Sequence, residues 1–454
     1  MTRSKPYSPV VFLVDNRRRD LDTAVLIAHQ LRTLGVECFL EPLEAFRAVL
    51  AAYKPGLIIF NHLFASHLVA WSKHLVDVGV LTAVLSNEGM YQKLDVRNFN
   101  AGQFHRGGHI DYFFCWNEVH REALINGDVY PGAQMEIVGV PRFDFYYEPW
   151  SRMIYRPSKE RTARRRILAC TNFGLSKFWD LPREEGDKFF SGWAARLPRY
   201  RDYWRAIESH WKSQRRFLDY LAPLVASNEF DITLRPHPAE KYEVYETWLA
   251  ALSEADRKHV TMDTQSNINS LILGCDLELS GESCTTSVEC WIAGKPNIEL
   301  VFDRHPMLYS EERSRGNVHC DDPAKIVDLV RQQLARPVQS ELQEIRRDYL
   351  ARWCATPDGN ACRRIAEIAA TAVKSKRPAD WSKLTISDYR RAAKLKAYRT
   401  LGQAYHFDPL LPIKRMLFAD RYALKQWVYD KSIKPRDVEV ARLRIERTTN
   451  LTDA

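Results

Sequence analysis

Short apolar runs that alternate with amphipathic helical stretches are the feature that most limits how this chain can fold. Residues 10–14 (VVFLV) form an uninterrupted apolar run, and a polar loop and a helical pattern over residues 21–34 follow it. Similar runs recur at 37–40, 57–60, 80–85, 110–115 and 135–140. Because helices between parallel strands cover both sheet faces, we expect a doubly wound α/β domain here.

A second series of runs starts after the basic, aperiodic residues 156–166, which we interpret as a linker. Its predicted strands are at 167–170, 231–234, 259–262, 277–279 and 297–301. Helical patterns follow at 324–334, 340–353 and 361–373. Two Rossmann-type halves facing a cleft are the architecture of GT-B glycosyltransferases, so the predicted fold class is α/β and GT-B-like.

The positive charge lies in the last of three expected parts. Residues 1–155 would be an acceptor domain, 156–373 a nucleotide-sugar donor domain, and 374–454 a basic helical tail. The chain has a net charge of +9, and the tail, with 19 basic and 9 acidic residues, carries +10, leaving −1 elsewhere. This balance argues against nucleic-acid binding by the body. It favours either a tail that meets an anionic membrane or acidic partner, or helices packed on the body.

Cysteine usage and the N-terminal residues indicate the compartment. The nine cysteines include no CxxC pair, so neither a disulfide framework nor a zinc site is indicated, and most should be buried. No apolar run is long enough for a membrane span, and residues 10–14 are too short for a signal peptide. We therefore expect a cytoplasmic protein, with the tail allowing association with the inner face of the membrane.

Aromatic residues mixed with arginines mark residues 178–220. Helical spacing fits the second half of this segment, which favours a packed helix pair. The alternative is that some of these aromatic rings stack on sugar rings.

The sequence Arg235-Pro236-His237-Pro238 directly follows a predicted strand. The two prolines restrict the backbone on either side of His237 and so fix the direction of its side chain. An imidazole beside an arginine can bind a phosphate and stabilise a nucleotide leaving group. The alternative is an ordinary loop histidine.

A small polar turn at residues 281–287 precedes another predicted helix. Hydroxyl groups and helix N-terminal amides there would bind phosphate oxygens, or would merely cap the helix. The candidate phosphate ligands are Gly281, Ser283, Thr285, Thr286 and Ser287. We expect Glu282 to bind a ribose or sugar hydroxyl.

Other polar residues also follow predicted strands. Glu88 lies in an Asn-Glu-Gly turn and is the candidate general base that deprotonates an acceptor hydroxyl, the alternative being a surface glutamate. Asn16 and Arg17 follow the first strand and would contact an anionic donor or acceptor. Further candidates at strand ends are Asn61, His62 and Asn172.

A possible metal site at residues 104–109 (FHRGGH) is not favoured. His105 and His109 have neither a helical spacing nor partner carboxylates. We expect no metal and no cofactor apart from the nucleotide-sugar substrate.

Two of these motifs resemble those of bacterial surface-carbohydrate enzymes. Asn87-Glu88-Gly89 and Arg235-Pro236-His237-Pro238 are similar to motifs of capsule polysialyltransferases and Kdo transferases of lipopolysaccharide synthesis. The resemblance implies that Glu88 is the base, that His237 with Pro238 acts at the phosphate, and that residues 283–287 bind the CMP phosphate. Asn87 stands where that family has an acidic residue. Asp358-Gly359-Asn360 is similar to the family's C-terminal pattern.

The sequence thus predicts a metal-independent glycosyltransferase. It would move a sugar such as Kdo or a sialic-acid-like sugar from a CMP-activated donor to a surface polysaccharide or glycolipid acceptor. One alternative is a CDP-polyol phosphotransferase of the teichoic-acid kind, which also uses His-Pro near a nucleotide phosphate. Another is a non-catalytic assembly scaffold that retains the fold.

Overall fold

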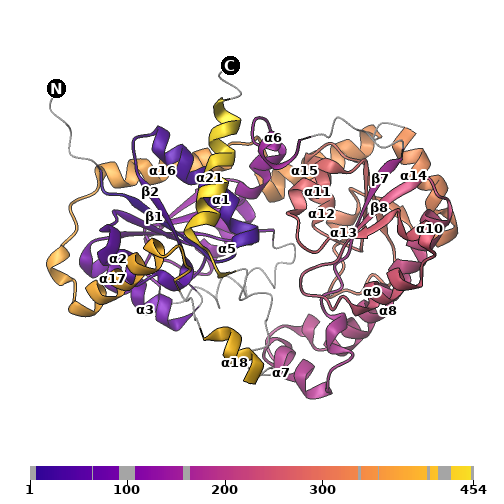
Figure 1. The fold of residues 1–454 in the computed structure, drawn as a ribbon, viewed down its shortest axis with the longest axis horizontal. Helices are drawn as coiled ribbons and strands as arrows, with labels where there is room; N and C mark the ends of the chain where they lie inside the picture. Colours follow the sequence, from indigo (N-terminus) through magenta and orange to yellow (C-terminus); the bar gives the residue numbers. More distant parts are fainter. Residues whose placement is uncertain are drawn as a thin grey trace. The chain divides into compact units, whose positions relative to one another are not determined.

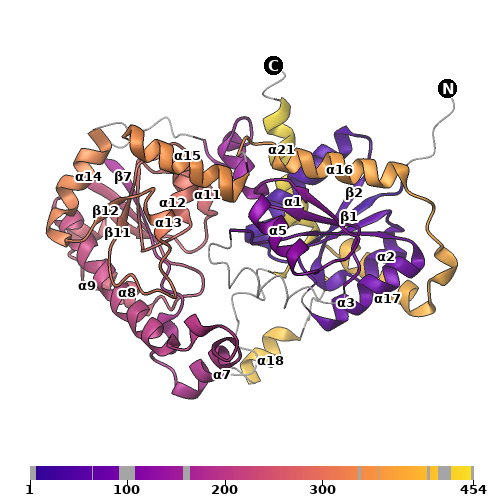
Figure 2. The ribbon, with the colours of Figure 1, turned by 180° about the vertical axis from the view of Figure 1, so that it is seen from behind.

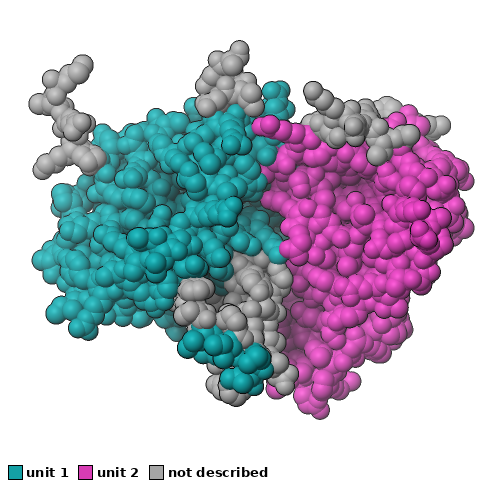
Figure 3. Space-filling model, in the orientation of Figure 1, with its two compact units in different colours: residues 1–153, 352–454 teal, residues 154–351 magenta. Residues whose placement is uncertain are grey.

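The chain divides into two compact units (Figure 3). Unit 1 comprises residues 1–153 and 352–454, and unit 2 comprises residues 154–351. The computed structural model describes residues 7–63, 65–90, 108–156, 164–335, 339–355, 357–405, 410–417 and 431–450. This division differs from the predicted one, because residues 352–373 and the tail belong to unit 1.

Unit 1 contains a parallel sheet with the strand order β2-β1-β3-β4-β5-β6. Its strands are β1 (Val10–Val14), β2 (Cys38–Pro42), β3 (Leu57–Phe60), β4 (Leu81–Leu85), β5 (Tyr112–Cys115) and β6 (Gln134–Ile137). The predicted strands of this half are all present, with ends that differ by a few residues. In the register, Val11 lies opposite Phe39 on one side and Ile58 on the other.

Helices from both chain segments cover the sheet of unit 1 (Figures 1 and 2). The first segment gives α1 (Arg17–Thr33), α2 (Ala48–Tyr53), α3 (Ser66–Val78) and α5 (Glu118–Asn126). The second gives α16 (Ala361–Ser375), α17 (Ile386–Thr400) and α21 (Pro435–Asn450). This segment also contains the short helix α18 (Leu411–Leu417), which lies apart from the sheet. Helices α16 and α21 pack against α1, and α17 packs against α2.

The tail helices take part in the hydrophobic core of unit 1. Leu395 of α17 and Tyr405 belong to the same buried cluster as Phe60 and Leu75. Ala441 and Ile445 of α21 are also buried. The described tail residues therefore correspond to the predicted alternative of helices packed on the body.

Unit 2 repeats the architecture with the strand order β12-β11-β10-β7-β8-β9, again parallel. Its strands are β7 (Arg165–Cys170), β8 (Phe230–Arg235), β9 (Val260–Met262), β10 (Leu277–Ser280), β11 (Asn297–Leu300) and β12 (Val318–Cys320). The last of these was not predicted, because its three residues, VHC, have no apolar periodicity.

The helices of unit 2 differ in length. They are α7 (Arg183–Ala194), α8 (Tyr203–Ala226), α9 (Glu243–Ala251), α10 (Glu254–Arg257), α11 (Ile268–Gly274), α12 (Thr286–Ile292), α13 (Glu311–Ser314) and α14 (Ile326–Ala335). Two further helices, α6 (Ser151–Ile154) and α15 (Ser340–Cys354), cross the boundaries between the units.

The aromatic segment forms the α7–α8 helix pair. Phe178, Phe190 and Ile207 are buried together, and Tyr203 and Trp204 pack against them. Most of these rings therefore have a structural role, as the first interpretation predicted. Trp179 and Phe189 are 41% and 56% exposed, so these two rings remain accessible to a ligand.

Two other expectations concern the cysteines and membrane spans. All nine cysteines are unpaired, and eight of them are buried while Cys38 is partly exposed, as predicted. Within the described parts of the chain, none of the helices is both long and apolar enough to cross a bilayer.

Candidate functional site

Each sheet has one position at which the strand order reverses direction. In unit 1 it lies between β1 and β3, and in unit 2 it lies between β7 and β10. Open α/β sheets bind ligands outside the carboxyl ends of the strands at such a switch point. The two switch points therefore locate the candidate site residues in each unit.

Asparagine side chains connect the strand ends at the switch point of unit 1. The backbone N–H of Asp15, after β1, donates to Oδ1 of Asn61, after β3, at 3.0 Å. Nδ2 of Asn61 donates to Oδ1 of Asn87, after β4, at 3.0 Å. Asn61, a predicted cleft residue, is thus buried and holds three loops in register.

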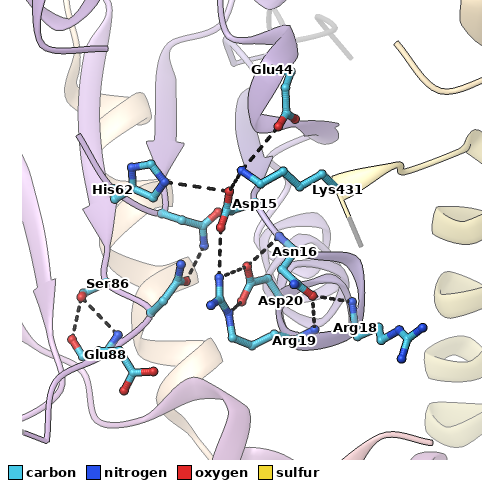
Figure 4. A network of polar contacts seen from close by, with 12 residues as sticks. Asp15, Asn16, Arg18, Arg19, Asp20, Glu44, His62, Ser86, Glu88 and Lys431 are labelled. Atoms are coloured by element: carbon cyan, nitrogen blue, oxygen red, sulfur yellow. Dashed lines mark hydrogen bonds and ion pairs between the residues drawn. The ribbon is translucent and has the colours of Figure 1, made fainter. Parts of the chain in front are cut away.

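Asp15 is the centre of a charged cluster (Figure 4). Nζ of Lys431, from the C-terminal segment, lies 2.8 Å from its carboxylate, Arg19 lies at 3.2 Å, and Nε2 of His62 at 3.9 Å. Burial alone would raise the pKa of Asp15, but the contacts of His62 and Lys431 outweigh burial and hold the pKa below its usual range. The carboxylate therefore stays ionised and positions three cationic or polar side chains.

Asn16 and Arg17, predicted to meet an anionic ligand, have structural partners. Oδ1 of Asn16 accepts the backbone N–H groups of Arg18 and Arg19 at 2.9 and 3.0 Å, so Asn16 is the N-cap of α1. Arg17 forms an ion pair with Asp437 of α21 at 3.5 Å. These contacts explain both residue types without a ligand.

Glu88 has an exposed side chain on a fixed backbone. The hydroxyl of Ser86 donates to the carbonyl of Glu88 at 2.6 Å and accepts its N–H at 3.3 Å. Beside this turn is a small cavity of about 30 Å³. Its lining includes Arg19, Asn61, Asn87, Trp116 and Arg142, and the guanidinium of Arg142 lies 4.8 Å from the Trp116 ring. A carboxylate held in this way at a strand end can accept a proton from a bound hydroxyl.

Two loops approach closely at the switch point of unit 2. A Cβ atom on Gly281, after β10, would lie 2.4 Å from Oδ1 of Asn172, after β7. A larger residue at position 281 would have to displace the Asn172 amide, which explains the glycine physically. Nδ2 of Asn172 donates to the carbonyl of Glu282 at 2.6 Å, so the two predicted residues join the loops.

His237 forms a tight turn at the end of β8. Its Nδ1 accepts the backbone N–H of Ala239 at 3.1 Å, so the ring proton of the neutral form is on Nε2. Neighbouring protein atoms displace water from the imidazole and so disfavour its charged form, which lowers the pKa of His237. The positive charges of Lys177 and Arg235 lower it further. The residue is nevertheless exposed, and it presents a neutral N–H donor near neutral pH.

Glu240, which was not among the predicted site residues, stabilises the His237 turn through hydrogen bonds to the β7 loop. Its buried carboxylate accepts hydrogen bonds from the Thr171 hydroxyl at 2.8 Å and the Phe173 N–H at 2.7 Å. The Thr171 oxygen in turn accepts the N–H of His237 at 3.1 Å. Glu240 therefore connects the His237 turn to the β7 loop. The sequence signal that could have identified Glu240 is its position three residues after His237, close enough for its side chain to support the same turn.

Arg235 and Pro238, two further predicted phosphate ligands, belong to the same turn. Nη1 of Arg235 donates to the carbonyl of Asp263 at 2.8 Å, which holds the guanidinium beside the next loop. Pro238 is exposed and acts through its effect on the backbone. Arg235 still supplies a positive charge close to His237.

Residues 282 and 283 mainly support the neighbouring loop. The carboxylate of Glu282 accepts the N–H groups of Phe302 and Arg304 at 2.6 and 3.0 Å. Ser283 has φ +54°, and its Oγ accepts the N–H of Ser310 at 2.7 Å. The carboxylate that was expected to bind a sugar hydroxyl is thus bonded to backbone.

Three of the four predicted hydroxyl ligands have partners inside unit 2. Ser283 bonds as described, Thr286 donates to the buried carboxylate of Glu278, and Ser287 donates to the Cys284 carbonyl at 2.8 Å. Thr285 is exposed, and it precedes α12 without capping it through its side chain. A phosphate at this turn would therefore meet Thr285 rather than Ser287.

The comparisons with known proteins give a fold but not a family. No family model and no curated protein matches the chain. The wall teichoic acid polymerase TagF has a TM-score of 0.50 at 11% identity, over 82% of this chain and 90% of that one. The fold is GT-B-like. A putative UDP-N-acetylglucosamine 2-epimerase from Listeria monocytogenes has a TM-score of 0.49 at 13% identity, over 83% and 99% of the two chains.

The possible metal ligands are only partly described. His105 and Arg106 lie outside the described residues. The side chain of His109 is exposed, and its backbone N–H donates to the Ser72 hydroxyl at 2.9 Å. Among the residues with a described placement, no group of three His, Cys, Asp or Glu side chains is arranged to hold a metal ion.

Proposed function

We propose that the protein is a glycosyltransferase that uses a nucleotide-activated sugar. The observation that carries the proposal is the His237 turn, which aims an Nε2–H donor outward at a strand end, near Arg235 and Lys177. A nucleotide phosphate develops negative charge as the sugar leaves, and this donor and the two cations would stabilise it. They also provide an electrostatic basis for departure of the nucleotide without a metal ion.

Glu88 would be the general base of this reaction. Its exposed carboxylate would take the proton of an acceptor hydroxyl as that oxygen attacks the anomeric carbon. The proposed acceptor is a surface polysaccharide or glycolipid. The proposed donor is a CMP-linked acidic sugar such as Kdo or a sialic-acid-like sugar.

A CDP-polyol phosphotransferase is the second candidate. The fold likeness to a teichoic acid polymerase favours it, and the same histidine would serve at the phosphate of such a donor. The product distinguishes the two reactions, because one forms a glycosidic bond and the other a phosphodiester.

Nucleotide binding is the first test. We expect CMP to raise the melting temperature of the full chain, since a ligand that binds only the folded state stabilises it. If CDP or UDP stabilises the protein and CMP does not, the proposed donor is wrong. If no nucleotide or nucleotide sugar raises the melting temperature, the result favours the non-catalytic scaffold.

Variants at the two proposed catalytic residues are the second test. His237→Ala should lower kcat by about 100- to 1,000-fold, as the loss of one such donor does elsewhere. Glu88→Gln should lower kcat by a similar or larger factor without weakening CMP binding. His259→Ala, at the amino end of β9, is the matched control and should be neutral. Undiminished transfer by a well-folded His237→Ala variant would refute the mechanism.

A further inference from the structure

Four aromatic side chains gather in unit 1, and they are Phe46, His67, Trp71 and His74. The Phe46 ring lies 5.5 Å from the ring of His67 and 5.9 Å from that of Trp71. Phe46 comes shortly after β2, whereas the other three belong to α3, which follows β3. The cluster therefore joins segments that follow the two strands on either side of β1.

Arg47 lies on this cluster without a counter-charge. The central carbon of its guanidinium is 5.2 Å from the Phe46 ring and 5.9 Å from the Trp71 ring. Its Nε is buried without a hydrogen-bond partner, and among the residues that the structure describes no carboxylate pairs with it. Aromatic rings repay only part of the cost of taking a guanidinium out of water. The side chain is partly exposed, so an anion from solvent can reach it and supply the missing charge.

The first turn of α3 adds positive potential beside Arg47. Helix α3 has 13 residues, its N-cap is Ala65, which cannot cap through its side chain, and its first turn contains no acidic residue. The N–H groups of this turn therefore keep their partial positive charge. Trp71, which is only 9% exposed, also has a buried indole N–H without a partner. Donors of three kinds thus meet here, and no anionic side chain of the described structure pairs with them.

Arg47 lies on the edge of the sheet at which ligands are expected. Glu44, three residues earlier, is 3.6 Å from Nζ of Lys431, which pairs with Asp15 at 2.8 Å (Figure 4). Asp15 directly follows β1, at the switch point of unit 1. Open α/β sheets bind ligands at this edge. The unpaired guanidinium is therefore close to the place at which unit 1 would hold the acceptor.

We propose that Arg47, His67 and the first turn of α3 bind a phosphate or carboxylate group of the acceptor, which is therefore an acidic saccharide. A planar guanidinium can donate to two oxygens of such a group. The exposed imidazole of His67 packs on the same Phe46 ring as Arg47 and offers a further donor. The inference rests on the proposed function only in identifying the anion as part of the acceptor.

Three small sugars test the chemistry of this site. Glucose 1-phosphate and glucuronate carry the two candidate anions, and glucose carries neither. Each is titrated into the full chain by isothermal titration calorimetry. We expect the wild type to bind at least one of the charged sugars, more weakly as the salt concentration rises, and to bind glucose far more weakly. Binding of glucose as tightly as the charged sugars, or of none of the three, would overturn the inference.

Variants locate the binding. Arg47→Met keeps an apolar stem on the rings and removes the guanidinium, and it should weaken binding of the charged sugars by about 10- to 100-fold. Lys73→Met removes an exposed cation of the same helix and is the matched control, which should bind like the wild type. Undiminished binding in Arg47→Met, or equal losses in the two variants, would refute the site.

His67→Ala keeps the question decidable if Arg47→Met does not fold. His67 is exposed, so its loss should leave the fold intact and weaken binding of the charged sugars by about 3- to 10-fold. Wild-type binding in this variant would contradict the proposal.

CMP distinguishes this inference from the proposed function. Arg47→Met should bind CMP like the wild type, because CMP is expected in unit 2. Binding of the charged sugars that depends on His237 and not on Arg47 would refute the acceptor site and leave the proposed function intact. If the wild type binds no nucleotide and Arg47→Met still loses the charged sugars, the proposed function fails and the anion site of unit 1 stands.

Discussion

Glu278 is a buried carboxyl group in the middle of β10. Its side chain is fully enclosed, and Thr286 donates a hydrogen bond to it. Burial raises its pKa to about 7, and the hydrogen bond offsets this only in part. The folded protein therefore keeps a proton on Glu278 at a pH at which the unfolded chain has released it.

This gives a pH dependence of stability with a definite sign. The pKa of Glu278 is about 7 in the folded state, against 4.5 for a glutamate in water, so stability falls as pH rises from about 4.5 to 7. Glu278→Gln should remove a contribution of up to about 3 kcal/mol over this window. Urea unfolding at pH 5, 6, 7 and 8 measures it. Equal pH slopes for variant and wild type would contradict the assignment.

At the residue scale, position along the chain was predictable and side-chain direction was not. Glu88, Asn172 and His237 were found because they follow predicted strands, and the structure has them there. The directions of the Thr286 and Ser287 hydroxyls depend on the packing of α12 on β10, which a sequence pattern does not contain.

At the scale of elements, the tail helices are held by charge as well as by apolar contacts. Arg444 of α21 pairs with Asp22 of α1 at 2.8 Å, and Lys431 pairs with Asp15. Arg399 of α17 bonds to the buried Glu41 of β2 and, at 3.0 Å, to the hydroxyl of Tyr53 of α2. Part of the basic charge of the tail thus meets acidic groups of unit 1. Binding to an anionic membrane stays a prediction for liposome sedimentation to test.

Removing Arg399 should weaken the docking of α17. Arg399→Leu leaves the Glu41 carboxylate, 4% exposed, without its cation, and we expect unit 1 to lose about 2–3 kcal/mol. This is below the cost for fully buried pairs because the Arg399 side chain is 37% exposed. Urea unfolding measures the loss, with Lys396→Leu on the exposed face of α17 as the control. Adding Glu41→Gln should restore part of the stability; a further loss would contradict the explanation.

Element type was easier to predict than element length. The parallel strands carry continuous apolar runs, whereas the helical spacing in the second half of residues 178–220 did not indicate how far α8 (Tyr203–Ala226) extends. Pro223 lies within the last turn of α8 and does not end the helix, so a proline does not mark this boundary in the sequence.

At the scale of the molecule, the second crossing between units gives no sequence signal. The chain returns to unit 1 within α15, between residues 351 and 352, where the helical pattern continues without glycine, proline or a polar run. The boundary near residue 154 precedes the basic stretch that was interpreted as a linker. A boundary inside a helix cannot be found from composition, because the local pattern is the same on both sides.

This division predicts that the two units depend differently on the tail. Deleting residues 374–454 removes Leu395, Tyr405, Ala441 and Ile445 from the interior of unit 1. At about 2–5 kcal/mol for each large apolar side chain lost, the deletion approaches the whole stability of a domain. We expect calorimetry of the truncated chain to show only the transition of unit 2.

Residues 154–351, which are contiguous and have their own core, should unfold cooperatively when expressed alone. A truncated chain with the wild-type thermogram, or an unfolded 154–351 segment, would show that the units are not organised in this way.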